Sequence, residues 1–203
     1  MKTILMTGFE TFGSDTINPS IEAVNSLPET LGDIRIIKAE IPTVRDTSLK
    51  KIIALIEEHH PDAVISVGMA GGRKGISVER IGINLDDYRI EDNAGNQPHD
   101  EPVVPGGPDG LFASIPVRRI ADAMNEAGIE ASVSCTAGTF VCNHVLYGTR
   151  HYILQKHLNI QSGFIHVPYM CEQLKDHPDA PTMALEDIVK GLCIAIQKTA
   201  EGL

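Results

Sequence analysis

Short apolar segments alternate with segments of helical periodicity along most of the chain, and this alternation constrains the fold more than any other feature. The apolar segments are rich in Ile and Val, whereas the segments between them place apolar residues three or four positions apart. Alternating strands and helices are typical of an α/β protein with a mostly parallel sheet. We therefore expect a three-layer α/β/α sandwich with a mostly parallel, twisted central sheet. No linker divides the chain, so residues 1–203 are expected to form a single domain.

The same pattern predicts the element boundaries. Asn18 is expected to cap the first helix with Pro19 at its first position, and Thr182 is a candidate cap for the last helix. The stretch 86–110 is polar and rich in Pro and Gly, and a loop of this length is usually functional or disordered. We expect it to be a lid, a subunit contact, or both. The expected strands are 3–7, 34–41, 63–68, 76–84, 130–135 and 163–167, and the expected helices are 19–27, 47–60, 117–127, 141–157 and 185–200.

Charge and cysteine content exclude several classes of protein. The chain has 27 acidic and 17 basic residues and a formal net charge of −10, which argues against nucleic acid and anionic membranes as partners. No apolar run approaches the roughly 20 residues of a membrane span, and no export signal is apparent. A reducing, cytoplasmic location is therefore expected, with the four cysteines as free thiols. Their spacing contains no CxxC pair, so a structural metal site is not expected.

Cys142 is the best-placed candidate nucleophile. Residues 136–140 form a loop between an expected strand and an expected helix, so Cys142 would lie in the first helical turn. Free backbone N–H groups and the helix dipole favour a thiolate there, and the same groups could bind an oxyanion. The alternative is a small buried hydrophobic residue, and position alone does not decide between the two. Core packing is the favoured interpretation of Cys135 and Cys193, whereas Cys171 falls in a loop.

A cysteine nucleophile needs a base, and His166 is the best placed of the eight histidines. It lies near the end of the expected strand 163–167. If this strand runs parallel to 130–135, the carboxyl ends of both lie at one edge of the sheet, close to Cys142. His144 is two positions from Cys142 on the same helix and therefore points away from it.

A third group should orient the histidine, and carboxylates are the usual choice. Glu79 stands out because it lies inside an apolar strand, although the residues alone favour a solvent-facing strand position. The turn 68–73, which ends in Arg73, could hold an anion, but a tight turn is the simpler interpretation.

Two of the nine aromatic residues, Phe9 and Phe12, lie in one loop between glycines. Exposed aromatic rings are costly unless they pack or line a pocket. A small apolar ring would suit such a pocket.

Several segments together resemble one known family. They are 7–13 with 18–20, 71–85, 89–98, 134–144 and 163–169, and they follow the family's order across almost the whole chain. The most specific are Ala137-Gly138-Thr139-Phe140-Val141-Cys142-Asn143-His144 and the strand that ends at His166. In these segments the chain resembles pyroglutamyl-peptidase I (pyrrolidone-carboxylate peptidase), a family of cytosolic cysteine peptidases.

The resemblance implies a Glu79–Cys142–His166 triad and the removal of an N-terminal pyroglutamyl residue from peptides. It implies further that Cys142 forms an acyl-enzyme, with no metal or cofactor, and that the protein is a homotetramer. The residues expected to bind substrate are Phe9, Phe12 and Asn18 around the ring, Arg89 near the site, and the backbone of Val141 at the oxyanion. One position departs from the family: many bacterial members have Gln where this chain has Met69.

Two other functions are compatible with parts of the sequence. A nucleoside phosphorylase-like enzyme would use the turn Gly68–Arg73 for phosphate and stack a base on Phe9 or Phe12. A binding protein without catalytic activity would hold pyroglutamyl peptides, or another small ligand, and leave them uncut.

Overall fold

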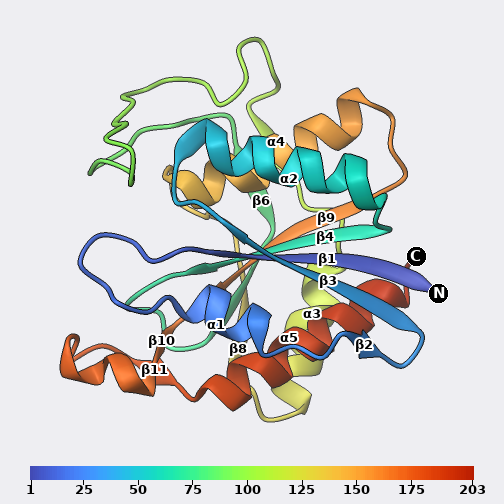
Figure 1. Cartoon of the computed structure of the whole chain (residues 1–203), viewed down its shortest axis with the longest axis vertical. Coiled ribbons are helices and arrows are strands. Elements are labelled where there is room, and N and C mark those ends of the chain that lie inside the picture. The colour runs from blue at the N-terminus through green and yellow to red at the C-terminus, as the bar shows by residue number, and fades with distance from the viewer.

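A seven-stranded sheet separates two layers of helices in the computed structural model, which describes all residues from 1 to 203 (Figure 1). The strand order is β2-β3-β1-β4-β9-β5-β8. The strands of this sheet are β1 (Lys2–Phe9), β2 (Thr30–Leu31), β3 (Ile34–Ile41), β4 (Ala63–Met69), β5 (Ile76–Glu79), β8 (Ala131–Ser134) and β9 (Gln161–Val167). The helices are α1 (Pro19–Asn25), α2 (Arg45–His59), α3 (Val117–Glu126), α4 (Val141–Gln155) and α5 (Leu185–Ala200).

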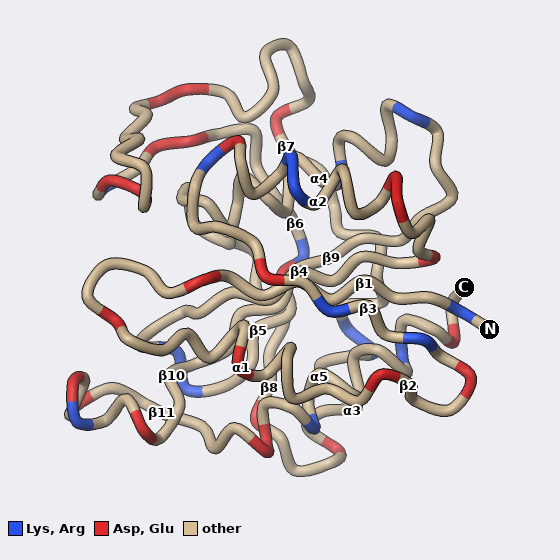
Figure 2. Tube along the Cα trace, in the orientation of Figure 1, with Lys and Arg blue, Asp and Glu red and all other residues tan.

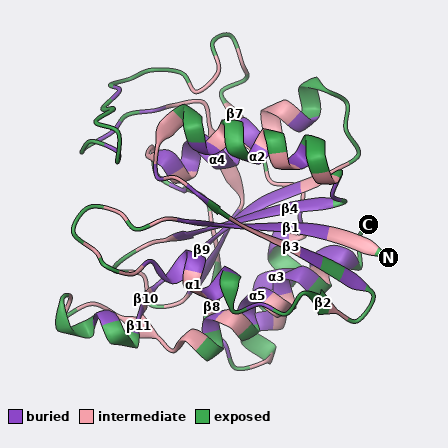
Figure 3. Cartoon of the chain, in the orientation of Figure 1, coloured by how far each residue is buried: buried purple, intermediate pink, exposed green.

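The predicted three-layer architecture is confirmed. Helices α2 and α4 cover one face of the sheet, and α1, α3 and α5 cover the other (Figure 1). Each face has its own buried core, and alternate residues of β4 divide between the two: Ile65 lies in one core and Val64 in the other. The central strands are the most continuously buried part of the molecule (Figure 3).

The sheet is mostly parallel but not wholly so. Parallel pairing joins β3, β1, β4 and β9 in turn and also joins β5 to β8, whereas β5 is antiparallel to β9. The expectation that the strand before Cys142 runs parallel to the strand of His166 is therefore wrong. The carboxyl ends of β8 and β9 still lie close together. The strand between them, β5, is only four residues long and ends opposite Phe164, two residues before His166.

The predicted strand 76–84 is in fact two strands in different sheets. The chain leaves the central sheet at Arg80, whose N–H donates to the Ser134 carbonyl. Beyond it, β6 (Ile81–Ile83) pairs with β7 (Gly110–Phe112) in a two-stranded sheet. A second small sheet, formed by β10 (Tyr169–Met170) and β11 (Thr182–Met183), flanks the short 3-10 helix Cys171–Lys175. The break at Arg80 makes Glu79 the last residue of its strand.

Local predictions at the helix ends have mixed outcomes. Asn18 caps α1, accepting a hydrogen bond from the Ser20 N–H at 3.0 Å, and Pro19 begins that helix, both as expected. Thr182 does not cap α5: it lies in β11, and Ala184 precedes the helix without a side-chain cap. Cys135 lies just beyond β8 and is exposed, contrary to the expectation of core packing, whereas Cys193 packs against the core as predicted.

Charged residues are scattered along the chain with both signs interspersed (Figure 2). The segment between Asn84 and Asp109 contains no helix or strand except an isolated bridge between Asp86 and Glu101. None of the helices combines the length and the apolar character that crossing a bilayer requires.

Candidate active site

Cys142 lies in the first turn of α4, as predicted. The helix begins at Val141, and no side chain caps its N-terminus. The first N–H of the helical ladder belongs to His144, which donates to the Phe140 carbonyl at 3.1 Å. The backbone N–H groups of Val141 and Cys142 are therefore left for a ligand beside the cysteine sulfur.

The cysteine sulfur lies over Gly68 of β4, the strand that pairs with the strand of His166. A Cβ placed on Gly68 would come within 3.0 Å of Cys142 Sγ. Gly68 is the register partner of His166 on β9, and directly paired residues present their side chains on the same face of a sheet. The sulfur and the imidazole therefore share one side of the sheet, although their strands are not those that the sequence suggested.

Buried Glu79 and half-buried Arg73 complete a polar group around the histidine. The His166 Nδ1–H donates to Glu79 Oε1 at 2.7 Å, and Arg73 Nη1 donates to the same oxygen at 2.7 Å. Glu79 is fully buried, so it is not the solvent-facing strand residue that the sequence alone favoured. Arg73 Nη2 also donates to the Thr136 carbonyl, in the loop that leads to Cys142, at 3.1 Å.

The electrostatics of this group keep the carboxylate charged and the imidazole neutral. Burial acts to raise the pKa of Glu79, but its hydrogen bonds with His166, Ser134 and Arg73 outweigh burial, and the pKa is lowered. Burial lowers the pKa of His166 even though Glu79 opposes it. An ionised Glu79 only accepts hydrogen bonds, so the histidine proton lies on Nδ1 and Nε2 is free to take another.

The pKa of the Cys142 thiol is shifted opposite to the expectation from its helix position. Burial and the negative charge of Glu79 raise it to about 12, although Arg73 and the adjacent backbone N–H lower it. The resting thiol is therefore protonated at neutral pH. Attack on a substrate requires His166 to remove the proton as the sulfur forms its new bond.

A cavity of about 280 Å³ opens at Cys142. Of the predicted substrate-binding residues, Phe9, Phe12, Asn18 and Arg89 all line it. Val141, the fifth predicted residue, does not line the cavity and is fully buried. Met69, singled out in the sequence as a departure from the family, also lines the cavity, as do five residues that sequence reasoning did not assign to the site: Thr43, Asp87, Ile90, Thr139 and Phe140.

Aromatic rings form one wall of this cavity. Phe12 meets Phe140 edge-on at 5.4 Å between centroids, and Phe140 packs on the buried Tyr88 at 4.5 Å. Phe9 is the last residue of β1, not a loop residue as expected, and Phe12 lies in the loop that follows; their closeness in the sequence was the signal for such a wall. Phe140 and Tyr88 gave no comparable signal because their segments meet the loop only in the folded chain.

Asn18 and Met69 both have protein contacts of their own. Asn18 Oδ1 accepts from the N–H and the hydroxyl of Ser20, and Nδ2 donates one hydrogen bond to the Glu10 carbonyl. One Nδ2 proton is left for a ligand. Met69 Sδ lies 3.9 Å from the amide nitrogen of the buried Gln173, so its side chain is held partly by the protein.

The guanidinium at the end of the turn 68–73 is already paired within the protein. The Arg73 guanidinium, which a phosphate would need, bonds to Glu79 and to the Thr136 carbonyl. The phosphorylase-like alternative therefore has no support. No group of three or more His, Cys, Asp or Glu side chains is arranged to hold a metal ion.

Comparison with known proteins agrees with this geometry. The family model described as pyroglutamyl peptidase matches residues 2–202. The chain is 51% identical over 198 residues to the pyrrolidone-carboxylate peptidase of Clostridium botulinum, covering 98% of this chain and 93% of that protein. It is 50% identical over 194 residues to the corresponding Clostridium perfringens protein, covering 96% and 91%.

Solved structures give the same result. The crystal structure of Bacillus amyloliquefaciens pyroglutamyl peptidase I superposes with a TM-score of 0.96 at 44% identity, covering 99% of this chain and 98% of that one. A mutant pyrrolidone carboxyl peptidase from Pyrococcus furiosus superposes with a TM-score of 0.95 at 37% identity, covering 99% of each chain. The chain belongs to the pyroglutamyl peptidase family.

Proposed function

We propose that this protein hydrolyses the bond between an N-terminal pyroglutamyl residue and the rest of a peptide, with Cys142 as nucleophile, His166 as acid and base, and Glu79 as the group that orients His166. One observation carries the proposal. A cysteine at an uncapped helix N-terminus opens into an aromatic cavity of about 280 Å³, beside a buried His–Glu pair.

The cavity suits a small, uncharged ring. Phe9, Phe12 and Phe140 offer apolar surface to ring methylenes, and the spare Nδ2 proton of Asn18 can bond to a lactam oxygen. A free α-ammonium group would lose its hydration against these rings. Pyroglutamate has no such group because its nitrogen lies within the lactam. We place Arg89 at the mouth of the same cavity, near the peptide that leaves.

The first half-reaction transfers the acyl group to the sulfur. His166 Nε2 takes the Cys142 proton while the sulfur attacks the carbonyl carbon of pyroglutamate, and the N–H groups of Val141 and Cys142 hold the resulting oxyanion. As the tetrahedral intermediate collapses, the carbon–nitrogen bond breaks. His166 then gives its proton to the departing amine, and the acyl group stays on Cys142 as a thioester.

The second half-reaction regenerates the thiol. Water attacks the thioester while His166 removes its proton, and the proton then passes to the departing sulfur. Glu79 stabilises the imidazolium that forms in each half-reaction. No step requires a metal or cofactor.

The remaining expectations belong to the same proposal. Residues 1–203 form one catalytic domain, since the cavity and the triad draw on segments from Phe9 to His166. Exposed thiols at Cys135 and Cys171 fit a reducing, cytoplasmic location. The family resemblance supports a homotetramer, which would cover exposed apolar side chains such as Phe112, and light scattering would measure it.

The test compares three fluorogenic substrates that differ only in the first residue: pyroglutamyl-, prolyl- and glutaminyl-aminomethylcoumarin. We expect release from the pyroglutamyl substrate alone, and iodoacetamide should abolish it. No release would refute the proposal in favour of a binding protein. Release that iodoacetamide leaves intact would refute the nucleophile.

A further inference from the structure

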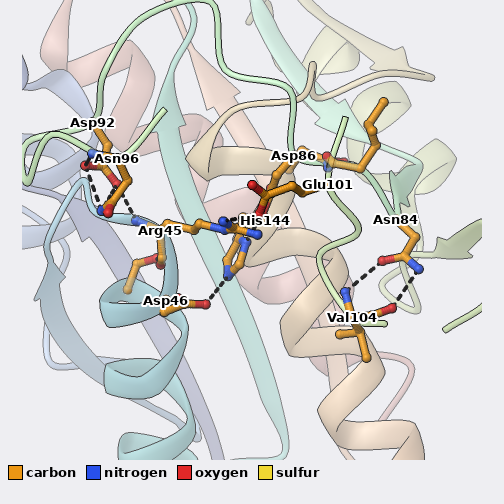
Figure 4. Close-up of polar contacts among 12 residues, drawn as sticks. Arg45, Asp46, Asn84, Asp86, Asp92, Asn96, Glu101, Val104 and His144 are labelled. Carbon is orange, nitrogen blue, oxygen red and sulfur yellow. Dashed lines mark hydrogen bonds and ion pairs between the residues drawn. The ribbon is translucent and has the colours of Figure 1, made fainter. Parts of the chain in front are cut away.

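A second buried polar cluster lies outside the triad, centred on the carboxylate of Asp86 (Figure 4). Asp86 is fully buried, and its Oδ2 accepts hydrogen bonds from Arg45 Nε at 2.9 Å and from His144 Nδ1 at 2.8 Å. His144 is 1% exposed and lies two residues after Cys142 on α4, whereas Arg45 is the first residue of α2. One carboxylate therefore joins both helices of this layer to the start of the long loop.

The same cluster also holds the returning half of that loop. Arg45 Nη1 donates to Glu101 at 2.7 Å, and the backbones of Asp86 and Glu101 exchange hydrogen bonds at 2.7 and 3.0 Å. The Arg45 N–H donates to Asp92 at 2.9 Å, and Asp92 itself closes a turn by accepting from Asn96 (Figure 4). Residues 86, 92–96 and 101 are thus all held by contacts at the first turn of α2.

The residues that follow Asp86 form one wall of the cavity. Asp87, Arg89 and Ile90, directly after Asp86, line the cavity, and Tyr88 between them supports Phe140. The Asp87 N–H donates to the Thr139 carbonyl at 3.2 Å, and the Thr139 hydroxyl donates to the Asp87 carbonyl at 2.7 Å. The wall is therefore held both by Thr139, which lines the cavity, and by the contacts of Asp86 with Arg45 and His144, which do not.

We propose that Asp86, Arg45 and His144 form a positioning cluster that holds residues 87–90 against the helix of Cys142 and so sets the affinity for the substrate ring. This rests on the proposed function, in which the cavity binds that ring. Both donors share Oδ2, and Oδ1 has no hydrogen-bond partner, so an amide at this position could keep both bonds but would remove the negative charge that pairs with Arg45. The cluster acts on binding and leaves the triad, which it does not contact, to carry out the chemistry.

The test is the substitution Asp86→Asn, with Asp100→Asn as the matched control. Asp100 lies on the same loop, is exposed, has no ion pair, and has a φ of 52° that Asn tolerates. We expect Asp86→Asn to raise KM for pyroglutamyl-aminomethylcoumarin about tenfold, because two hydrogen bonds to a charged carboxylate become weaker bonds to a neutral amide. The kcat should change less than KM, and iodoacetamide should alkylate Cys142 at the wild-type rate. Asp100→Asn should leave all three values unchanged.

A conservative pair at His144 keeps the test independent of whether Asp86→Asn folds. The amide nitrogen of Asn can occupy the place of Nδ1 and keep the bond to Asp86, whereas Leu cannot. We expect His144→Asn to keep a KM near that of the wild type and His144→Leu to raise it. Equal KM values for the two variants, or a fall in kcat and alkylation together with the rise in KM, would overturn the inference.

Hydrogen exchange separates failure of this inference from failure of the proposed function. In Asp86→Asn, backbone amides of residues 87–97 should exchange faster while those of α5 keep their protection. If the wild type cleaves no pyroglutamyl substrate but this loop loosens as expected, the proposed function fails and the positioning role stands. If the wild type cleaves the substrate and the variant keeps both loop protection and KM, the positioning role fails.

Discussion

The substitution Gly68→Ala tests the position of the nucleophile from the opposite side of the site. A Cβ on Gly68 would lie 2.9 Å from Phe164 Cζ and 3.0 Å from Cys142 Sγ, whereas ordinary contacts fall at 3.4–4 Å. Phe164 is fully buried and cannot withdraw easily. The sulfur must therefore move by about 0.4 Å to reach the short end of the ordinary contact range, and by about 1.0 Å to reach its long end.

Displacements of this size are costly for a reaction that depends on alignment. Misplacement by about 1 Å can reduce a rate about 10²-fold, so we expect kcat to fall by about 10-fold to 10²-fold. Turnover of pyroglutamyl-aminomethylcoumarin measures this effect, and thermal unfolding checks that the variant folds. Gly202→Ala is the matched control, because a Cβ there meets nothing closer than 3.5 Å. A folded Gly68→Ala protein with wild-type kcat would refute the placement of Cys142 beside His166.

Three further predictions concern the charges around His166. Glu79→Gln should lower kcat by on the order of 10²-fold with a smaller effect on KM, since the imidazolium loses its counter-charge, and an unchanged rate would remove Glu79 from the triad. Because burial lowers the pKa of His166, the acid limb of kcat/KM should be centred below 6.5, the ordinary histidine value; a limb above it would contradict the geometry. Arg73→Met removes a positive charge that also lowers the pKa of His166, so the acid limb of kcat/KM should move to higher pH. The control Lys74→Met, at the exposed neighbouring residue, should leave the acid limb in place.

Local sequence signals predicted the parts of the site that depend on a single element. The small-residue loop before Cys142 indicated a helix that begins just ahead of it, and α4 begins at Val141. Asn18 followed by Pro19 predicted the cap and first residue of α1. The family resemblance selected Glu79, which its strand pattern alone would have assigned to the surface. For the two helix starts, the residues that decide the structure are neighbours in the sequence, whereas Glu79 was selected by a resemblance that spans the chain.

Features that depend on distant segments could not be predicted in this way. β5 is antiparallel to β9, and the apolar periodicity of a strand does not indicate in which direction it runs relative to its neighbour. The cluster of Arg45, Asp86 and His144 joins residues about 40 to 60 positions apart, and each alone resembles an ordinary helix or loop residue. The raised pKa of Cys142 is a similar case, because burial by the folded chain outweighs the helix N-terminus.

The central claim is that Cys142 supplies the attacking sulfur. Its most direct test is the rate of pyroglutamyl-aminomethylcoumarin hydrolysis by Cys142→Ala beside Cys135→Ala, the exposed cysteine nearest to it in the sequence. We expect Cys142→Ala to lose at least about 10³-fold in kcat with unchanged circular dichroism, and Cys135→Ala to keep the wild-type rate. A folded Cys142→Ala protein that still turns over the substrate at a substantial rate would contradict the account.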